Sequence, residues 1–266
     1  MNIIESIIIA WESVWANKLR SLLTMLGIII GVSSVIAISA IGQGGQAALN
    51  KELEAFGGNR FMINYTYDSD SPITEADIFT LQDVKAIGDM SSAIDSIAAV
   101  SYDNANIRIK SKDISIRTIA TDEEYLGIAN LKLASGRFLS REDANARRSV
   151  AVINKSLAKE IANSGEAVGQ QVMVNQRSFQ IVGVLEEEQS MFSGGQDNKV
   201  LYMPITTYLS FTNSVWIGGI EGTAISQNHV DDGIKDALNI LHRRHHNKDK
   251  YLAFNFEKEM QSMKNI

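Results

Sequence analysis

The hydrophobic residues near the start of the chain form one long uninterrupted run. From Leu22 to Ile41 there are twenty consecutive uncharged residues, and no charged side chain occurs between Arg20 and Lys51. As a helix, such a run spans about 30 Å, the thickness of the hydrocarbon core of a bilayer. Core helices of soluble proteins are rarely this long and this apolar. The pattern predicts a transmembrane helix over residues 21–41.

A cleaved signal peptide is the competing interpretation of this run, because Ala37, Ser39 and Ala40 suit a cleavage site. Signal peptides, however, have a short basic head and a shorter apolar core. Here residues 1–20, which include Glu5 and Glu12, precede a full-length span. The transmembrane interpretation is therefore favoured.

Residues 1–20 have a helical pattern of their own. The hydrophobic positions that fall on one helical face are Ile4, Ile7, Ile8, Trp11, Val14 and Trp15. Polar residues occupy the other faces, which predicts an amphipathic helix lying along the membrane surface. Trp11 and Trp15 suit the headgroup region, where the indole ring and its polar N–H are both satisfied. The alternative is a helix packed in a soluble core.

Two basic residues predict the orientation of this span, and two glycines predict how it packs. Lys18 and Arg20 lie immediately before it, and no basic residue follows until Lys51, so the N-terminus is expected in the cytoplasm. Residues 42 onward are then extracytoplasmic. Gly27 and Gly31 form a small-xxx-small pair that allows close helix packing, a signal that is weak on its own.

The hydrophobic pattern changes twice beyond the span. Residues 42–56 keep a helical pattern and predict a stalk helix, which Gly57-Gly58-Asn59 ends. Short alternating runs then predict strands, with a helix over Thr74–Ile87 among them. The strands are expected at 61–63, 94–100, 107–109, 114–119, 149–153, 171–174, 179–185, 199–203 and 251–256, and further helices at 156–162 and 230–242. The predicted fold class is a two-lobed α+β domain behind the N-terminal helices.

Composition and charge exclude several function classes. The net charge is −6, so the basic surface that nucleic-acid binding needs is missing overall. The chain contains no cysteine, which excludes disulfides, thiol nucleophiles and cysteine-ligated metals. His242 and His246 are spaced as a metal pair on a helix, but no glutamate follows His242 as in a zincin motif. We expect no catalytic residue, no cofactor site and no metal site.

Several motifs together resemble the MacB-type, FtsX-like permeases of ABC transporters. The first span resembles theirs over Asn17–Val32, which reads NKLRSLLTMLGIIIGV. The further matches, in the order of the family, are Phe56–Asn59, Ser135–Phe138, Val168–Gln170, Phe179–Leu185, Tyr202–Pro204 and Arg243–His245. The resemblance covers essentially the whole chain.

The resemblance implies a subunit of the bacterial cell membrane with a cytoplasmic N-terminus and a large extracytoplasmic domain. In the family that domain has a base lobe and an inserted second lobe, which here gives 57–130 and 215–258 for the base, 131–214 for the insertion, and 259–266 as the start of a second stalk. It further implies homodimers, a partner ATPase that hydrolyses ATP, and a membrane-fusion adaptor. The implied function is transmission of ATPase-driven motion for efflux of drugs, peptides or toxins.

The family carries three further spans after this domain, and this sequence does not contain them. An expressed fragment, a split reading frame and an independent anchored domain are the competing explanations. The alternative function is a singly anchored binding or sensor module without an ATPase. A polar loop over 186–198 is the expected contact with an adaptor or substrate, through Met191, Phe192, Gly194 and Gly195.

Overall fold

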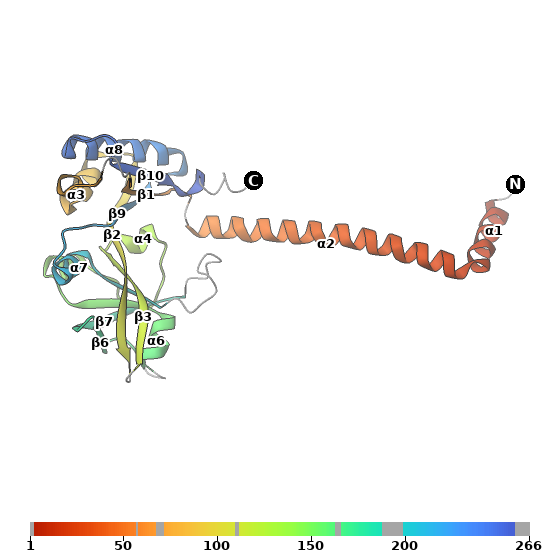
Figure 1. Ribbon diagram of the computed structural model, residues 1–266, viewed down its shortest axis with the longest axis horizontal. Coiled ribbons are helices and arrows are strands. Elements are labelled where there is room, and N and C mark those ends of the chain that lie inside the picture. The colour runs from red at the N-terminus through yellow and green to blue at the C-terminus, as the bar shows by residue number, and fades with distance from the viewer. Residues whose placement is uncertain are drawn as a thin grey trace. The chain divides into compact units, whose positions relative to one another are not determined.

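The computed structural model describes residues 3–56, 58–67, 72–109, 112–162, 166–187 and 199–258. The chain divides into two compact units, Met1–Lys51 and Glu52–Ile266. The N-terminal unit holds helix α1 (Ile3–Ala16) and most of helix α2 (Lys18–Phe56), which bend relative to each other at Asn17 (Figure 1). The Ser21 amide donates to the Asn17 carbonyl (3.1 Å) and starts the new helix.

Helix α2 contains the expected span and the expected stalk as one helix. Its segment Lys18–Gly45 has a mean hydropathy of 2.3 and is 0% buried, so it is long and apolar enough to cross a membrane. The Thr24 hydroxyl donates to the Arg20 carbonyl (3.1 Å), and the Ser34 hydroxyl to the Ile30 carbonyl (2.7 Å). These bonds satisfy the hydroxyls within the helix, as a hydrocarbon environment requires.

The second unit is built on a ten-stranded mixed sheet with the order β10-β1-β9-β2-β3-β8-β5-β7-β4, and with β6 pairing β2 and β7. The strands are β1 (Arg60–Tyr65), β2 (Ile94–Ile109), β3 (Lys112–Thr121), β4 (Leu133–Gly136), β5 (Val150–Asn154), β6 (Gln171–Val174), β7 (Arg177–Leu185), β8 (Val200–Pro204), β9 (Gly219–Ala224) and β10 (Tyr251–Asn255). The helices are η1 (Glu75–Asp77), α3 (Leu81–Met90), α4 (Tyr125–Ile128), α5 (Arg141–Asn145), α6 (Lys155–Ala162), α7 (Ile205–Thr212), η3 (Gln227–His229) and α8 (Val230–His245). The mixed α+β class predicted from the sequence is confirmed.

Strand β2 belongs to both halves of the sheet. Residues Ile94 to Val100 pair with β9, and residues Ser101 to Ile109 pair with β3. Helices α3 and α8 lie side by side and pack on the half formed by β1, β9, β10 and the start of β2 (Figure 1). The two strands expected at 94–100 and 107–109 are therefore one strand, which joins the halves.

Successive positions of β2 face opposite hydrophobic clusters. Ile97 and Ala99 belong to the larger cluster with Phe61, whereas Ala98 and Val100 belong to a second cluster with Tyr125. Both faces of the sheet are thus covered, which explains why the run 97–100 is apolar throughout.

The helix expected over Thr74–Ile87 begins later than predicted, at Leu81. Thr74 and Asp77 form a capping box, but it opens only the single turn η1. A second box, Thr80 with Asp83, starts α3 at Leu81. Two Thr-x-x-Asp boxes occur six residues apart, and the chain between them is extended because each box needs a β-region residue at its N-cap.

The expected lobe boundaries near residues 130 and 214 stay a prediction. Strand β3 precedes residue 130, yet it pairs in parallel with β8 of the expected inserted lobe, Arg117 opposite Val200. Hydrogen bonding in the sheet is therefore continuous across the expected boundary.

Candidate functional site

The residues expected at the membrane are exposed in the N-terminal unit. Trp11 and Trp15 show 66% and 63% of their surface, and Lys18 and Arg20 are exposed as well. A Cβ added at Gly27 or Gly31 would have no atom within 4 Å in this chain. The assigned roles in topology and helix packing stay predictions.

The sequence also singled out a loop for partner contact and a histidine pair with metal-ligand spacing. Met191, Phe192, Gly194 and Gly195 lie outside the described residues, so their expected partner contact stays a prediction. His246 adopts a left-handed conformation at the end of α8 and does not continue the helix on which His242 lies. The described residues contain no group of three or more His, Cys, Asp or Glu suited to hold a metal ion.

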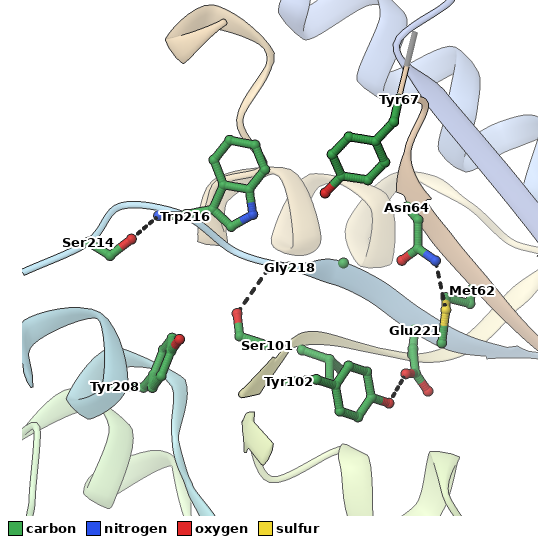
Figure 2. A pocket seen from close by; sticks show the side chains of 12 residues that line it. Met62, Asn64, Tyr67, Ser101, Tyr102, Tyr208, Ser214, Trp216, Gly218 and Glu221 are labelled. Carbon is green, nitrogen blue, oxygen red and sulfur yellow. Dashed lines mark hydrogen bonds between the residues drawn. The ribbon is translucent and has the colours of Figure 1, made fainter. Parts of the chain in front are cut away.

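A cavity of about 470 Å³ lies where β2 passes from one half of the sheet to the other. Its residues come from β1 and the chain just after it, from β2 and β9, and from the segment from α7 to β9 (Figure 2). They are Met62, Asn64, Tyr67, Val100, Ser101, Tyr102, Tyr208, Ser214, Trp216, Gly218, Gly219 and Glu221. The volume falls within the range of small-ligand sites.

A buried charge network forms the base of this cavity. The guanidinium of Arg60 on β1 donates to the carboxylate of Glu221 on β9, and the Tyr102 hydroxyl donates to the same carboxylate. Tyr125 of α4 shares a hydrogen bond with Tyr102 (3.1 Å) and accepts a long one from Arg60 (3.4 Å). Strands β1, β2 and β9 thus meet at one carboxylate, and α4 joins the network through the Tyr125 hydroxyl.

The network fixes the charge states of its members. Burial alone would lower the pKa of Arg60, but the adjacent Glu221 carboxylate raises that pKa above its usual value. Burial and the nearby Tyr125 and Glu221 raise the pKa of Tyr102. At neutral pH the base of the cavity is therefore a neutralised ion pair with a protonated tyrosine.

An aromatic cluster holds Trp216 in place at the wall of the cavity. The Trp216 ring lies 4.7 Å from that of Tyr65, which stacks on Phe79 at 4.3 Å. The Tyr65 hydroxyl donates to the Ile217 carbonyl (2.8 Å) and accepts from the Phe79 amide (2.9 Å), which fixes the segment that carries Trp216.

Glycines allow β1 and β9 to approach beside the cavity. A Cβ at Gly219 would lie 2.6 Å from Asn64 Oδ1 and 3.1 Å from the Ile63 carbonyl. The Gly218 amide donates to the Ser101 hydroxyl (2.9 Å), which ties this segment to β2.

The carboxylate of Asp122 also contacts β2, on the residue before Val100. It accepts hydrogen bonds from the Ala99 amide (3.2 Å) and the Glu124 amide (3.3 Å). Burial raises the pKa of Asp122 to about 7, and the neighbouring Glu123 and Glu124 add to the shift. A carboxyl that titrates near neutrality therefore lies beside the junction of the two halves.

Sequence reasoning did not find this cavity. Its aromatic residues are separated by up to about 150 positions, and only the fold brings them together. The one usable signal was the pair Gly218-Gly219, which follows Trp216 and Ile217, because glycine within a strand often marks a close backbone approach.

The fold and these features define a class of protein: an α+β domain attached to an N-terminal helix that is long and apolar enough to span a membrane. A family model described as the MacB-like periplasmic core domain matches residues 21–236. The chain belongs to this family, and the resemblance noted in the sequence is confirmed.

Relatives over nearly the whole chain are transporter permeases. The chain is 28% identical to the uncharacterized ABC transporter permease YknZ of Bacillus subtilis, over 97% of this chain and 65% of YknZ. It is also 28% identical to the macrolide export ATP-binding/permease protein MacB of Chlorobium luteolum, over 89% of this chain and 36% of that protein. The chain thus spans less than two thirds of these relatives.

A solved structure shows the same fold. The periplasmic region of MacB from Actinobacillus actinomycetemcomitans matches with a TM-score of 0.67 at 21% identity, over 82% of this chain and 98% of that one.

Proposed function

We propose that the chain acts as a permease subunit of a MacB-like ABC transporter. Its N-terminus is cytoplasmic, α2 crosses the membrane, and the domain from residue 58 onward is extracytoplasmic. ATP is hydrolysed by a partner ATPase subunit. A second copy of the chain and a membrane-fusion adaptor complete the assembly. The cargo is a drug, a peptide or a toxin, and the relative from Chlorobium luteolum is named for macrolide export. The observation that carries the proposal is the match of residues 21–236, which includes the apolar helix as well as the domain.

The chain between α2 and the sheet is suited to transmit movement. Only Gly57 and Gly58 separate the end of α2 from Asn59, whose side chain donates to the Ala224 carbonyl of β9 (2.6 Å). The Asn59 carbonyl in turn accepts from the Ala224 amide (2.8 Å). The next residue, Arg60, enters the buried network with Glu221. We propose that a displacement of α2 is passed through this short connection to strands β1 and β9.

Cysteine labelling tests the proposed topology directly, since the natural chain has no cysteine of its own. Ser13→Cys in α1 and Lys248→Cys after α8 place single thiols at exposed positions on either side of the span. In intact cells a membrane-impermeant maleimide is expected to label Lys248→Cys and to label Ser13→Cys only after permeabilisation. The opposite pattern, or equal labelling of both, contradicts the proposed orientation.

Co-purification separates the permease from the singly anchored binding module. The tagged chain, extracted from its native cell in detergent, is expected to bring along an ATP-binding cassette subunit and an adaptor. The Asn59→Ala variant is expected to keep these partners, because the contact it removes is internal to the outer domain. Recovery of the chain alone, folded and anchored, supports the binding module instead.

A further inference from the structure

The ring of His245, the last residue of α8, has an acceptor next to each of its two nitrogens. Its Nδ1 lies 2.7 Å from the Ala76 carbonyl oxygen of η1, and its Nε2 lies 3.0 Å from a carboxylate oxygen of Asp83 in α3. The side chain is only 9% exposed, so water competes little for either contact. Helices α3 and α8 lie side by side (Figure 1). One ring thus joins the end of α8 both to α3 and to η1.

Neither partner of the ring can donate a proton to it. A backbone carbonyl is an acceptor only. Burial alone would raise the pKa of Asp83, but hydrogen bonds from Arg244 and Thr80 lower that pKa, so the carboxyl is ionised at neutral pH. The oxygen that faces His245 already accepts from the Thr80 amide (2.6 Å) and the Thr80 hydroxyl (2.7 Å). Both contacts of His245 are therefore hydrogen bonds only in the imidazolium form, which has two N–H donors.

The neutral ring can satisfy only one of the two acceptors. It has a single N–H and turns the lone pair of its other nitrogen toward the remaining acceptor. A hydrogen bond to the Asp83 carboxylate is charge-assisted and is stronger than one to the Ala76 carbonyl. A lone pair is also repelled more by a carboxylate than by a carbonyl. We therefore expect the neutral ring to keep Asp83 and to lose Ala76.

The charges around the ring stay balanced when its proton leaves. The titratable and charged groups that border it are Asp83 of α3, Asp77 of η1, Arg244 and His242 of α8, and Tyr251 of β10. Arg244 Nε donates to the second oxygen of Asp83 (2.5 Å), so this carboxylate remains paired without His245. The Asp77 carboxylate accepts from the side chains of Thr74 and Asn247. Deprotonation of the ring thus leaves neither carboxylate without a hydrogen-bond donor.

We propose that His245 is a pH-sensitive clasp on η1. The doubly protonated ring holds the Ala76 carbonyl, and the neutral ring releases it. Histidine ordinarily changes its charge between about pH 5 and pH 8. The clasp is therefore closed in acid and open in mild alkali. It belongs to the outer domain alone and does not rest on the permease role.

The segment held by the clasp leads directly into the aromatic cluster behind the cavity. The Phe79 amide donates to the Tyr65 hydroxyl (2.9 Å), and Tyr65 packs against Trp216. The Tyr251 hydroxyl still donates to the Asp77 carbonyl (2.8 Å) when Ala76 is released, so the turn loosens without detaching. The clasp thus sets how firmly residues 74–79 are held beside this cluster.

Hydrogen–deuterium exchange of the full chain in detergent tests the proposal. His245→Gln has one uncharged donor nitrogen, so it serves one acceptor at every pH. Comparing this variant with the natural chain at the same pH cancels the intrinsic pH dependence of exchange. In peptides that cover residues 74–80, the variant should exchange about fivefold faster at pH 5, as expected for the loss of one hydrogen bond, and at about the same rate at pH 8.

Two comparisons make the result specific to His245. His229→Gln replaces an exposed histidine of η3 and should leave the exchange of residues 74–80 unchanged at both pH values. Peptides that cover β5 should exchange equally in the natural chain and in His245→Gln at a given pH. Near-ultraviolet circular dichroism verifies that each variant is folded.

A further measurement does not need a variant of His245. In the natural chain, after correction for intrinsic rates, the protection of residues 74–80 should fall about fivefold from pH 5 to pH 8. Asp122→Asn should show the same fall. This variant lacks the carboxyl whose pKa of about 7 would otherwise contribute in the same pH range.

Three results overturn the proposal: the same rate ratio for His245→Gln at both pH values, protection of residues 74–80 that does not change with pH, or an equal effect of His229→Gln. Because the measurement uses purified chain without an ATPase, any of these leaves the topology and co-purification tests of the permease role unaffected.

Discussion

At the residue scale, the buried carboxylate of Asp83 contacts residues from two distant segments of the second unit. It accepts from Arg244 (2.5 Å) and from the hydroxyl and amide of Thr80, and it lies 3.0 Å from His245 Nε2. Burial alone would raise the pKa of Asp83, but the hydrogen bonds from Arg244 and Thr80 outweigh it and lower that pKa. The carboxylate thereby links the start of α3 to the end of α8.

Asp83→Asn is expected to lower the free energy of unfolding by about 2 kcal/mol at pH 7, since it removes a charge-assisted bond at a buried position. Because the folded-state pKa lies below the unfolded one, the contribution of Asp83 is present above about pH 4 and is lost as the pH falls further. Urea denaturation from pH 7 to pH 3 should therefore show the difference shrinking. Asp113→Asn, in an exposed pair with Arg108, is the control and should change little. A difference for Asp83→Asn that is constant with pH contradicts the assignment.

Asp122 contributes to stability with the opposite pH dependence, because its pKa is raised to about 7 rather than lowered. Between about pH 4 and pH 7 the folded state binds the extra proton, so this group makes the protein less stable as the pH rises. Relative to the natural chain, Asp122→Asn should gain about 4 kcal/mol of stability between pH 4 and pH 8. Thermal unfolding across this range measures the gain. The control is Asp95→Asn at an exposed position, whose stability should vary with pH as that of the natural chain does. The same pH dependence for Asp122→Asn and the natural chain would show that Asp122 ionises normally.

At the element scale, two glycines decide whether β4 can pair with β7. Gly136 has a φ of +74° and lies opposite Gly183. A Cβ on Gly183 would come within 2.1 Å of the Arg137 carbonyl. Gly183→Ala is therefore expected to push the edge strand away and to cost about 2–4 kcal/mol in urea denaturation. Gly127→Ala, with no atom within 4 Å of its Cβ, should cost little. Equal effects of the two would contradict a steric role for Gly183.

This pair also shows how far the sequence could predict the elements. The stretches Ser135–Phe138 and Phe179–Leu185 are recognisable separately, and alternation identifies the second as a strand. Periodicity cannot reveal that their glycines face each other, because that contact depends on the order of strands in the sheet. For the same reason the sequence placed β6 and α8 well but divided β2 into two strands and missed β4 and β9. It also merged η1 with α3, where local capping chemistry overrides the hydrophobic spacing.

The cavity could not be predicted from the sequence, because it depends even more on how distant segments are arranged in the fold. Asn64, Tyr102 and Trp216 each have an ordinary structural interpretation in the sequence, and the segments that carry them are separated by whole elements. Only the crossing of β2 between two halves of the sheet brings them to one place. The membrane helix lies at the other extreme, because length and hydropathy are local properties that the chain shows directly.

At the scale of the whole molecule, the proposed orientation depends on only two charges, Lys18 and Arg20. Residues 21–50 contain no charged side chain, and Lys51 is the first basic residue on the other side of the span, so the two charges before it outnumber the one after it. The double substitution Lys18→Glu, Arg20→Glu is therefore expected to invert or scramble the topology, whereas the same change at Arg108 and Lys112, far from the span, should not. With Lys248→Cys as the reporter, maleimide labelling in intact cells should fall severalfold in the first variant only. Unchanged labelling would mean that the folded outer domain, rather than the flanking charge, sets the orientation. In that case the domain is translocated whatever precedes the span, and Lys18 and Arg20 serve another purpose at the membrane surface.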